Sequence, residues 1–228
     1  VLEPSAGHGA IARFIPETAN ATAIEPSYTL MDQLQALFEG KKLRHTFEEH
    51  HIVNKYDVIL MNPPFGVGGS DAVKHLAKAA EHLREGGRVI AIIPEGPAAD
   101  QKFDKWYESD DAQGVHLTAE IGLPTVTFER AGTSVKTRLV ILDKLSDRVA
   151  KLGATLPQQR SRRDIQADDA NGLFDRLEHM TMPDRVKMPE ATQAKPKAEP
   201  APEAAANAKP GEAPPAGVFK TDSFVSSK

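Results

Sequence analysis

Cysteine is absent from this chain of 228 residues, and its absence excludes several kinds of chemistry at once. Without thiols the protein has no disulfide bonds, no thiolate-bound zinc and no cysteine nucleophile. Long hydrophobic runs are also missing, since none approaches the roughly 20 residues that a membrane-spanning helix needs. We therefore expect a soluble, cytoplasmic protein.

A leading methionine and a signal peptide are likewise absent. The chain opens on Val1-Leu2-Glu3-Pro4, with no charged leader before it. A strand needs about five residues, yet only Val1 and Leu2 precede the first turn-like segment. We therefore expect the sequence to begin inside, or just before, the first strand.

An excess of basic charge is the third absence. The formal net charge is -4, which argues against a domain that binds nucleic acid over its whole surface, although a local basic face is compatible with it. Arg160, Arg162 and Arg163 are such a local cluster, and we interpret them as solvated linker charges rather than phosphate ligands. The adjacent His50 and His51 point apart if they lie in a strand, so no metal site is expected.

Three regions differ in composition. Residues 1–145 alternate apolar runs with helical patterns, as expected of a folded α/β domain. Residues 146–189 form a polar extension in which residues 168–180 have the spacing of a short helix, with apolar positions at Leu173, Phe174, Leu177 and Met180. Residues 190–228 begin with a stretch rich in alanine and proline that cannot bury enough apolar surface to fold, so a disordered tail is expected.

The first region predicts a doubly wound α/β fold. Strands are expected at 21–24, 42–47, 56–61 and 88–93, and helices at 10–14, 27–38, 71–83 and 99–107, with Ser27 capping the second helix and Gly86-Gly87 closing the third. Residues 115–121 and 135–142 are predicted to form a final antiparallel pair. Alternating strands and helices with short loops indicate a mostly parallel sheet. Ligands of such sheets bind at the carboxyl ends of the strands.

A glycine-containing loop follows the first strand, with the sequence Glu3-Pro4-Ser5-Ala6-Gly7-His8-Gly9. Gly7 and Gly9 permit tight backbone geometry and the close approach of a ligand. The following helix start offers free N–H groups. The loop lacks the full dinucleotide-binding fingerprint and the lysine of a phosphate-binding P-loop.

Glu25 ends the second expected strand, about 20 residues after the glycine loop. In nucleotide-binding α/β folds, a carboxylate at this place accepts hydrogen bonds from ribose hydroxyls. We therefore predict that Glu25 is a ribose ligand.

The segment Asn62-Pro63-Pro64-Phe65 directly follows a buried strand. Consecutive prolines fix the backbone and remove two N–H donors. The turn therefore presents acceptors, namely the Asn62 side-chain oxygen and the Pro63 carbonyl, which suit an exocyclic –NH2 group. Phe65 offers a flat face on which a base can stack.

Glu-Pro-Ser-Ala-Gly-His-Gly followed by Asn-Pro-Pro-Phe resembles the motifs of amino-specific DNA methyltransferases, particularly the adenine-N6 class. The resemblance covers residues 1–145 and implies S-adenosyl-L-methionine as cofactor and DNA as substrate. It implies catalytic roles for Asn62, Pro63, Pro64 and Phe65. It implies that the cofactor is bound by Glu3, Pro4, Ser5, Gly7, Gly9 and Glu25, with Gly7 and Gly9 on its methionine side.

Some family features are lacking. Thr46 stands where the family usually has an acidic residue that contacts the cofactor adenine, so we assign this contact to Glu48 or to the backbone. The helix that usually completes the methionine pocket has no counterpart, and no target-recognition domain is apparent after residue 145. A recognition or helicase module, attached or separate as in restriction-modification systems, is therefore an expected partner.

Related functions remain open. The Asn-Pro-Pro motif also serves enzymes that methylate guanine N2 in ribosomal RNA or glutamine in release factors. A truncated module that binds nucleic acid without turnover is a further alternative. Methylation of cytosine C5 is excluded, because it needs a cysteine nucleophile.

Overall fold

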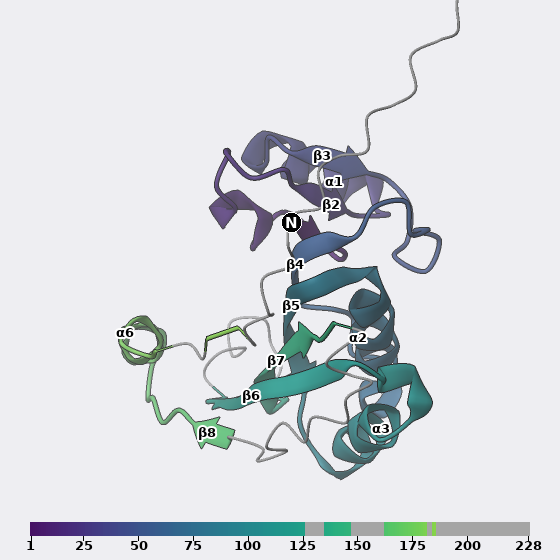
Figure 1. Cartoon of the computed structure of the whole chain (residues 1–228). Helices are drawn as coiled ribbons and strands as arrows, with labels where there is room; N and C mark the ends of the chain where they lie inside the picture. Colours follow the sequence, from purple (N-terminus) through teal and green to yellow (C-terminus); the bar gives the residue numbers. More distant parts are fainter. Residues whose placement is uncertain (126–134, 147–161, 182–183, 186–228) are drawn as a thin grey trace, which may run out of the picture. The chain divides into compact units, whose positions relative to one another are not determined.

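A computed structural model of the chain describes residues 1–125, 135–146, 162–181 and 184–185 (Figure 1). The chain divides into two units, Val1–Glu190 and Ala191–Lys228. The second unit and the whole of the tail predicted at 190–228 lie outside the described residues. The first unit contains one sheet with helices on both of its faces.

Eight strands form the sheet. They are β1 (Leu2–Glu3), β2 (Thr22–Ile24), β3 (Lys41–Leu43), β4 (Tyr56–Met61), β5 (Leu83–Pro94), β6 (Val115–Leu123), β7 (Thr137–Lys144) and β8 (Arg162–Asp164). The described helices are α1 (Tyr28–Leu37), α2 (Ser70–His82), α3 (Pro97–Tyr107) and α6 (Ala170–Glu178), with 3₁₀ turns η1 (Ala12–Phe14), η2 (Val67–Gly69) and η3 (Asp110–Ala112).

The strand order is β3-β2-β1-β4-β5-β7-β6-β8. Only β7 runs antiparallel to its neighbours, β5 and β6. The direction of winding reverses between β1 and β4, which pair in parallel through Leu2 and Ile59. The glycine loop follows β1 and the Asn-Pro-Pro-Phe segment follows β4, so both lie at the point where ligands bind in sheets of this kind.

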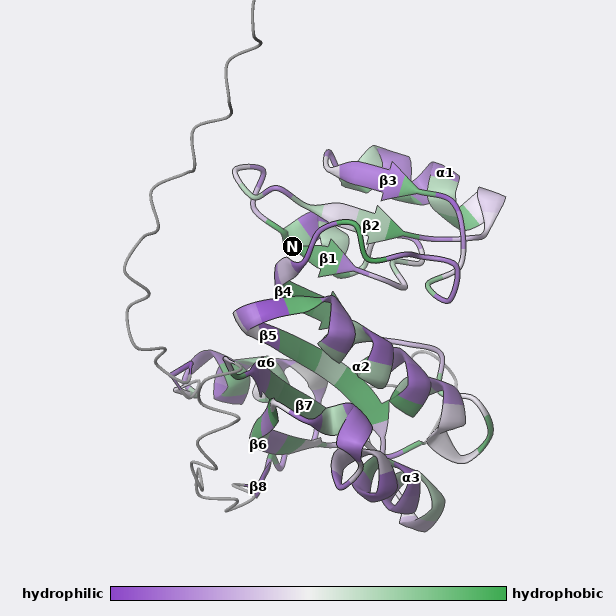
Figure 2. Ribbon diagram, turned by 45° about the vertical axis from the view of Figure 1, so that its right-hand side comes forward, coloured by the Kyte–Doolittle hydropathy of each residue, from purple (hydrophilic) through white to green (hydrophobic). Residues whose placement is uncertain are grey.

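Both faces of the sheet are covered, as the alternation along β5 illustrates. Val89, Ala91 and Ile93 point into the large core cluster that also contains residues of α2 and α3. Ile90 and Ile92 point to the other face, against the cluster that contains Leu173 of α6. Figure 2 shows the same division, with hydrophobic strands inside and hydrophilic helix surfaces outside. This pattern of two covered faces is the doubly wound α/β fold that the sequence predicts.

The start of β5 differs from the prediction. We expected Gly86-Gly87 to close a helix before a strand at 88–93, but the strand begins at Leu83 and contains both glycines. Tyr56 pairs with Leu83 and Val58 with Arg88, so residues 84–87 form a bulge opposite Asp57 alone. A side chain at Gly87 would lie 2.9 Å from the Tyr56 and Arg84 carbonyl oxygens. The glycine therefore permits close backbone approach within the strand.

Other elements were shorter than expected or were missed. Only the 3₁₀ turn η1 forms at 10–14, where a helix was predicted, and the third strand ends at Leu43 rather than at residue 47. Strand β8 was not predicted; it pairs in parallel with the edge of β6. Phe174, predicted to be an apolar contact of its helix, is 66% exposed. Its neighbour Leu173 makes the contact with the sheet.

No helix within the described part of the chain is long and apolar enough to cross a membrane.

Candidate functional site

The glycine loop folds against the end of β2. Ala6 donates its N–H to the Ile24 carbonyl at 2.9 Å, and Gly7 donates its N–H to Oε2 of Glu25, also at 2.9 Å. Both glycines have positive φ, 56° at Gly7 and 93° at Gly9, which side chains disfavour. A Cβ at Gly9 would contact Leu34, whereas a Cβ at Gly7 would meet no atom within 4 Å. The space beside Gly7 is therefore open to a ligand.

Glu25 is buried and held from two sides. Its Oε1 accepts the Ser27 N–H at 2.8 Å, while its Oε2 accepts the Gly7 N–H. Ser27 in turn caps α1 by accepting the Leu30 N–H through its side chain. A carboxylate has about four acceptor positions. Glu25 thus retains acceptor capacity for ligand hydroxyls while its orientation is fixed.

Glu3 is a buried carboxyl group at the end of β1. Its Oε2 has no hydrogen-bond partner among the described residues. Desolvation by burial raises the pKa of Glu3 to about 8, against a smaller lowering effect from the backbone N–H of Ala12. An uncompensated carboxyl oxygen of this kind favours a neighbouring cation or donor.

The segment after β4 alternates between exposure and burial. Asn62 and Pro64 are exposed, Pro63 is buried, and Phe65 is half-buried with part of its ring packed against the main core. Within the described ranges, the Asn62 side chain has no hydrogen-bond partner. The Phe65 carbonyl accepts the N–H groups of Asp71 and Ala72 at 3.2 and 3.4 Å. The first turn of α2 therefore holds the loop in place.

The loop after Phe65 is fixed by α3. The Lys102 ammonium donates to the carbonyls of Val67 and Gly68 at 3.1 and 2.7 Å. Beside it lies a cavity of about 300 Å³, formed where the loop meets the end of β5 and the start of α3. Its lining residues include Phe65, Gly66, Gly69, Pro94, Glu95 and Gly96.

A histidine that the sequence did not single out connects two of the predicted residues. His75 of α2 is buried; its Nδ1 lies 3.4 Å from Ser5 Oγ, and its Nε2 lies 2.8 Å from Glu48 Oε1. The pKa of the Glu48 carboxyl is lowered by its own backbone N–H first and by His75 next, against some desolvation. No local pattern marks His75, because its partners are 70 and 27 residues away in the sequence.

Thr46, at the family's acidic position, is itself capped by a carboxylate. Its N–H and hydroxyl both donate to Glu49 Oε2, at 2.9 and 3.2 Å. Glu48, not Glu49, is therefore the carboxylate that His75 connects to the glycine loop.

The first of the two adjacent histidines, His50, lies among side chains that pack against it. His50 and His51 lie in the loop after β3, and His50 stacks between His45 and His82. Desolvation first, and then neighbouring positive charges, lower the pKa of His50 to about 4. Across the described residues, no group of three or more histidine, aspartate or glutamate side chains is arranged to hold a metal ion.

The arginine cluster was interpreted as solvated linker charges, but Arg162 and Arg163 lie in strand β8. Arg162 pairs with Glu95 and Asp164, while Arg160 lies outside the described residues. Trp106 is buried in α3 beside Phe103, and His8 is exposed.

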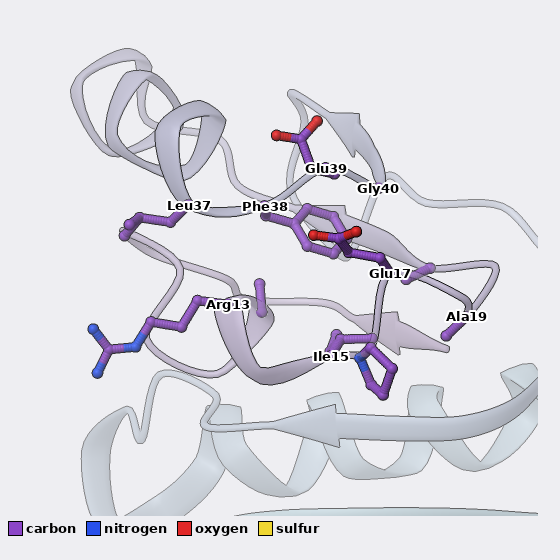
Figure 3. A pocket seen from close by; sticks show the side chains of 11 residues that line it. Arg13, Ile15, Glu17, Ala19, Leu37, Phe38, Glu39 and Gly40 are labelled. Atoms are coloured by element: carbon purple, nitrogen blue, oxygen red, sulfur yellow. The ribbon is translucent and has the colours of Figure 1, made fainter.

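Another cavity lies near the starts of β2 and β3. Figure 3 shows Arg13, Ile15, Glu17, Leu37, Phe38 and Glu39 around a cavity of about 140 Å³. Ala21 and Gly40, which precede β2 and β3, also line it. This cavity therefore lies at the amino ends of the strands, opposite the glycine loop and the Asn-Pro-Pro-Phe segment.

Comparison with known proteins bears on this arrangement. Residues 7–109 match the methyltransferase small domain family. This family and the fold support an S-adenosylmethionine-dependent methyltransferase, and the cofactor of this domain is S-adenosylmethionine. None of the curated proteins compared with the chain matches it significantly.

Several solved structures share the fold of this chain. A protein described as a class I S-adenosylmethionine-dependent methyltransferase from Listeria monocytogenes superimposes with a TM-score of 0.56 and 15% identity, over 78% of this chain and 62% of the Listeria chain. A protein described as an RNA methyltransferase from Pyrococcus horikoshii gives 0.50 and 17%, over 64% and 74%.

A modification subunit described as part of a type I restriction enzyme from Vibrio vulnificus gives a TM-score of 0.47 and 17% identity, over 63% of this chain and 40% of its own. The chain thus spans less than two thirds of the Listeria and Vibrio proteins.

Proposed function

We propose that this methyltransferase transfers the methyl group of S-adenosylmethionine to the N6 amino group of adenine in DNA. The observation that carries the proposal is the adjacency of two segments. Two neighbouring parallel strands, β1 and β4, are followed by the glycine loop and by Asn62-Pro63-Pro64-Phe65. Both segments therefore lie at the carboxyl ends of the strands. An acceptor turn beside a cofactor loop is the arrangement that methyl transfer to an amine needs.

The cofactor is assigned to the glycine-loop side, where four features fit it. The open space beside Gly7 accommodates the methionine part, together with Pro4, Ser5 and Gly9. The fixed carboxylate of Glu25 accepts ribose hydroxyls. The unpartnered Oε2 of Glu3 suits a cationic group, and Glu48 lies within reach of the loop through His75.

The reaction requires activation of a weak nucleophile, because the amino lone pair of adenine is delocalised into the ring. S-adenosylmethionine supplies an electrophilic methyl group. The Asn62 side-chain oxygen and the Pro63 carbonyl accept the two amine protons, which concentrates electron density on nitrogen and orients it. Pro64 keeps the turn rigid. No covalent enzyme intermediate is required, which is consistent with a chain that lacks cysteine.

The target base must leave the duplex before it reaches this turn, at a cost of a few kcal/mol. Phe65 offers a face for stacking the extruded base. The neighbouring cavity of about 300 Å³ is within the range of small-molecule sites, about 300–1,000 Å³. Choice of the DNA sequence is left to a recognition or helicase module, attached or separate.

The experiment is transfer of radiolabelled methyl groups to unmethylated duplex DNA, followed by nucleoside analysis. Ribosomal RNA and a glutamine-containing protein substrate are assayed in parallel. N6-methyladenine is expected as the sole labelled product. Label in guanine of RNA, or in protein, with unlabelled DNA would refute the DNA assignment and leave the methyltransferase assignment intact.

A further inference from the structure

We propose that His75 is a positioning residue for the cofactor: its imidazole joins the glycine loop to the segment after β3 and holds both in the arrangement that binds S-adenosylmethionine. The proposal rests on the cofactor side of the proposed function. It does not depend on which amine is methylated.

Both ring nitrogens of His75 have partners from distant parts of the chain. Ser5 lies in the loop after β1, and Glu48 lies after β3, while His75 itself belongs to the second turn of α2. Strand β2 separates β1 from β3 in the sheet. One side chain therefore bridges two segments that no direct strand pairing connects.

The partners determine where the ring carries its proton. A carboxylate can only accept hydrogen bonds, so Nε2 must carry the hydrogen that it donates to Glu48 at 2.8 Å. In a neutral ring, Nδ1 is then an acceptor. In that tautomer the Ser5 hydroxyl donates to Nδ1, across 3.4 Å. The direction of the Ser5 hydroxyl in the cofactor loop is thus set by the state of His75.

The ring is held firmly enough to act as a bridge. It is 6% exposed and packs edge-on against Phe47, with centroids 5.4 Å apart and planes at 64°. One turn further along α2, the Lys78 ammonium donates to the Glu48 carbonyl at 2.6 Å. The segment after β3 is therefore tied to α2 at two points, one of them the carboxylate that His75 orients.

The matched control comes from the same helix. His82 is also buried and also packs against Phe47, with centroids 5.3 Å apart. It contacts neither Ser5 nor Glu48; its Nδ1 bonds the Lys78 carbonyl instead. His75 and His82 thus share burial and ring packing and differ in their connection to the cofactor segments.

The test measures affinity for S-adenosylmethionine by calorimetry in four single variants and one double variant. His75→Phe keeps the ring and removes both hydrogen bonds, and we expect affinity to fall about tenfold or more, since each bond contributes of order a few-fold to tenfold. His75→Gln keeps a donor near the Nε2 position and should recover part of the affinity. His82→Phe should bind as the wild type. Ser5→Ala should cost less in the His75→Phe background than alone.

Two results would overturn the proposal. One is unchanged affinity in a folded His75→Phe variant, even if its melting temperature falls, because that pattern describes a structural role. The other is a wild-type ¹⁵N spectrum in which the His75 ring carries its proton on Nδ1 instead of Nε2. A wild type that binds the cofactor but leaves adenine in DNA unmethylated would refute the proposed substrate, and these readouts would still decide the role of His75.

Discussion

Strands β1 to β3, on the glycine-loop side of the sheet, and strands β4 to β7, on the side of the Asn-Pro-Pro-Phe turn, are stabilised by different kinds of contact. Strands β1, β2 and β3 are two or three residues long, and their contact with α1 and η1 is largely a cluster of alanines, including Ala6, Ala12, Ala21 and Ala23. Strands β4 to β7 are longer and pack leucine, isoleucine and valine side chains against α2 and α3, and α3 contributes Phe103 to the same cluster.

The second region also contains a buried ion pair. Arg88 of β5 donates to both oxygens of Asp143 on β7, at 2.6 and 2.8 Å, and Thr118 of β6 donates to the same carboxylate. At the glycine loop, by contrast, the loops are fixed by hydrogen bonds to Glu25 and His75. The comparison indicates that stability is concentrated behind the Asn-Pro-Pro-Phe turn, while the glycine-loop side depends on a few polar contacts.

The largest expected effect tests the stable region. Asp143→Ala removes the carboxylate that accepts two hydrogen bonds from the buried Arg88 guanidinium, so the free energy of unfolding should fall by about 3–5 kcal/mol. Urea denaturation measures this loss. Replacing both partners by apolar residues, as in Arg88→Met with Asp143→Leu, should restore most of it. A loss below about 1 kcal/mol in the single variant would contradict the contrast between the two regions.

The next effect concerns the acceptor turn. Asn62→Ala removes one acceptor for the amine protons, and methyl transfer at saturating substrate should slow roughly 100- to 1000-fold, by analogy with the loss of an oxyanion-hole donor. Affinity for S-adenosylmethionine should not change. Asn54→Ala, an exposed asparagine before β4, is the control and should remain active. Full activity in Asn62→Ala would reject the mechanism.

A substitution beside the glycine loop should lower affinity for the cofactor and leave turnover unchanged, which is the reverse of the effect expected for Asn62→Ala. Glu25→Gln replaces one acceptor oxygen by an amide NH2 that faces a backbone N–H of Gly7 or Ser27. Affinity for S-adenosylmethionine should fall about 10- to 100-fold, since hydrogen bonds to charged groups contribute about 1.5–3 kcal/mol. Turnover at saturating cofactor should be retained. Glu39→Gln, at the opposite edge of the sheet, is the matched control, and an equal loss there would show a nonspecific charge effect.

The smallest effect is a pH dependence that belongs to Glu3. Its pKa of about 8 in the free protein means that the carboxyl is mostly protonated at pH 6 to 7. A cationic ligand favours the ionised form and lowers this pKa, so binding should release a proton and affinity should rise with pH by at most about tenfold per unit. Calorimetry at pH 6, 6.5 and 7 measures the slope. Glu3→Gln retains the titration of the ligand itself and should give a flatter curve; equal slopes would exclude Glu3 as the source.

Much of the fold was predictable because strand and helix patterns end at recognisable residues. The run Tyr56–Met61 was predicted with the bounds that the structure has, since Asn62-Pro63 ends it. Ser27 was predicted to cap α1, and its side chain does so. The final antiparallel pair and the S-adenosylmethionine cofactor were also correctly predicted. The DNA substrate and the roles of individual site residues remain predictions.

The errors share a physical cause, which is that distant contacts override local patterns. Gly86-Gly87 resembles a helix end locally, but pairing with β4 makes it a bulge inside β5. Strand β8 has the polar sequence Arg-Arg-Asp and exists because the edge of β6 offers free backbone groups. His75 has no sequence motif, because its significance comes from Ser5 and Glu48, which only the folded chain brings together.

Helix α2 touches both sides of the site, because its first turn holds the Phe65 carbonyl and its second turn carries His75. A single rigid element that two ligands both stabilise gives them a coupling free energy, and such coupling is reciprocal. We therefore expect nucleic acid to bind more tightly when the cofactor product S-adenosylhomocysteine is present, and the cofactor to gain affinity by the same factor when nucleic acid is present. In the His75→Phe variant both gains should shrink together.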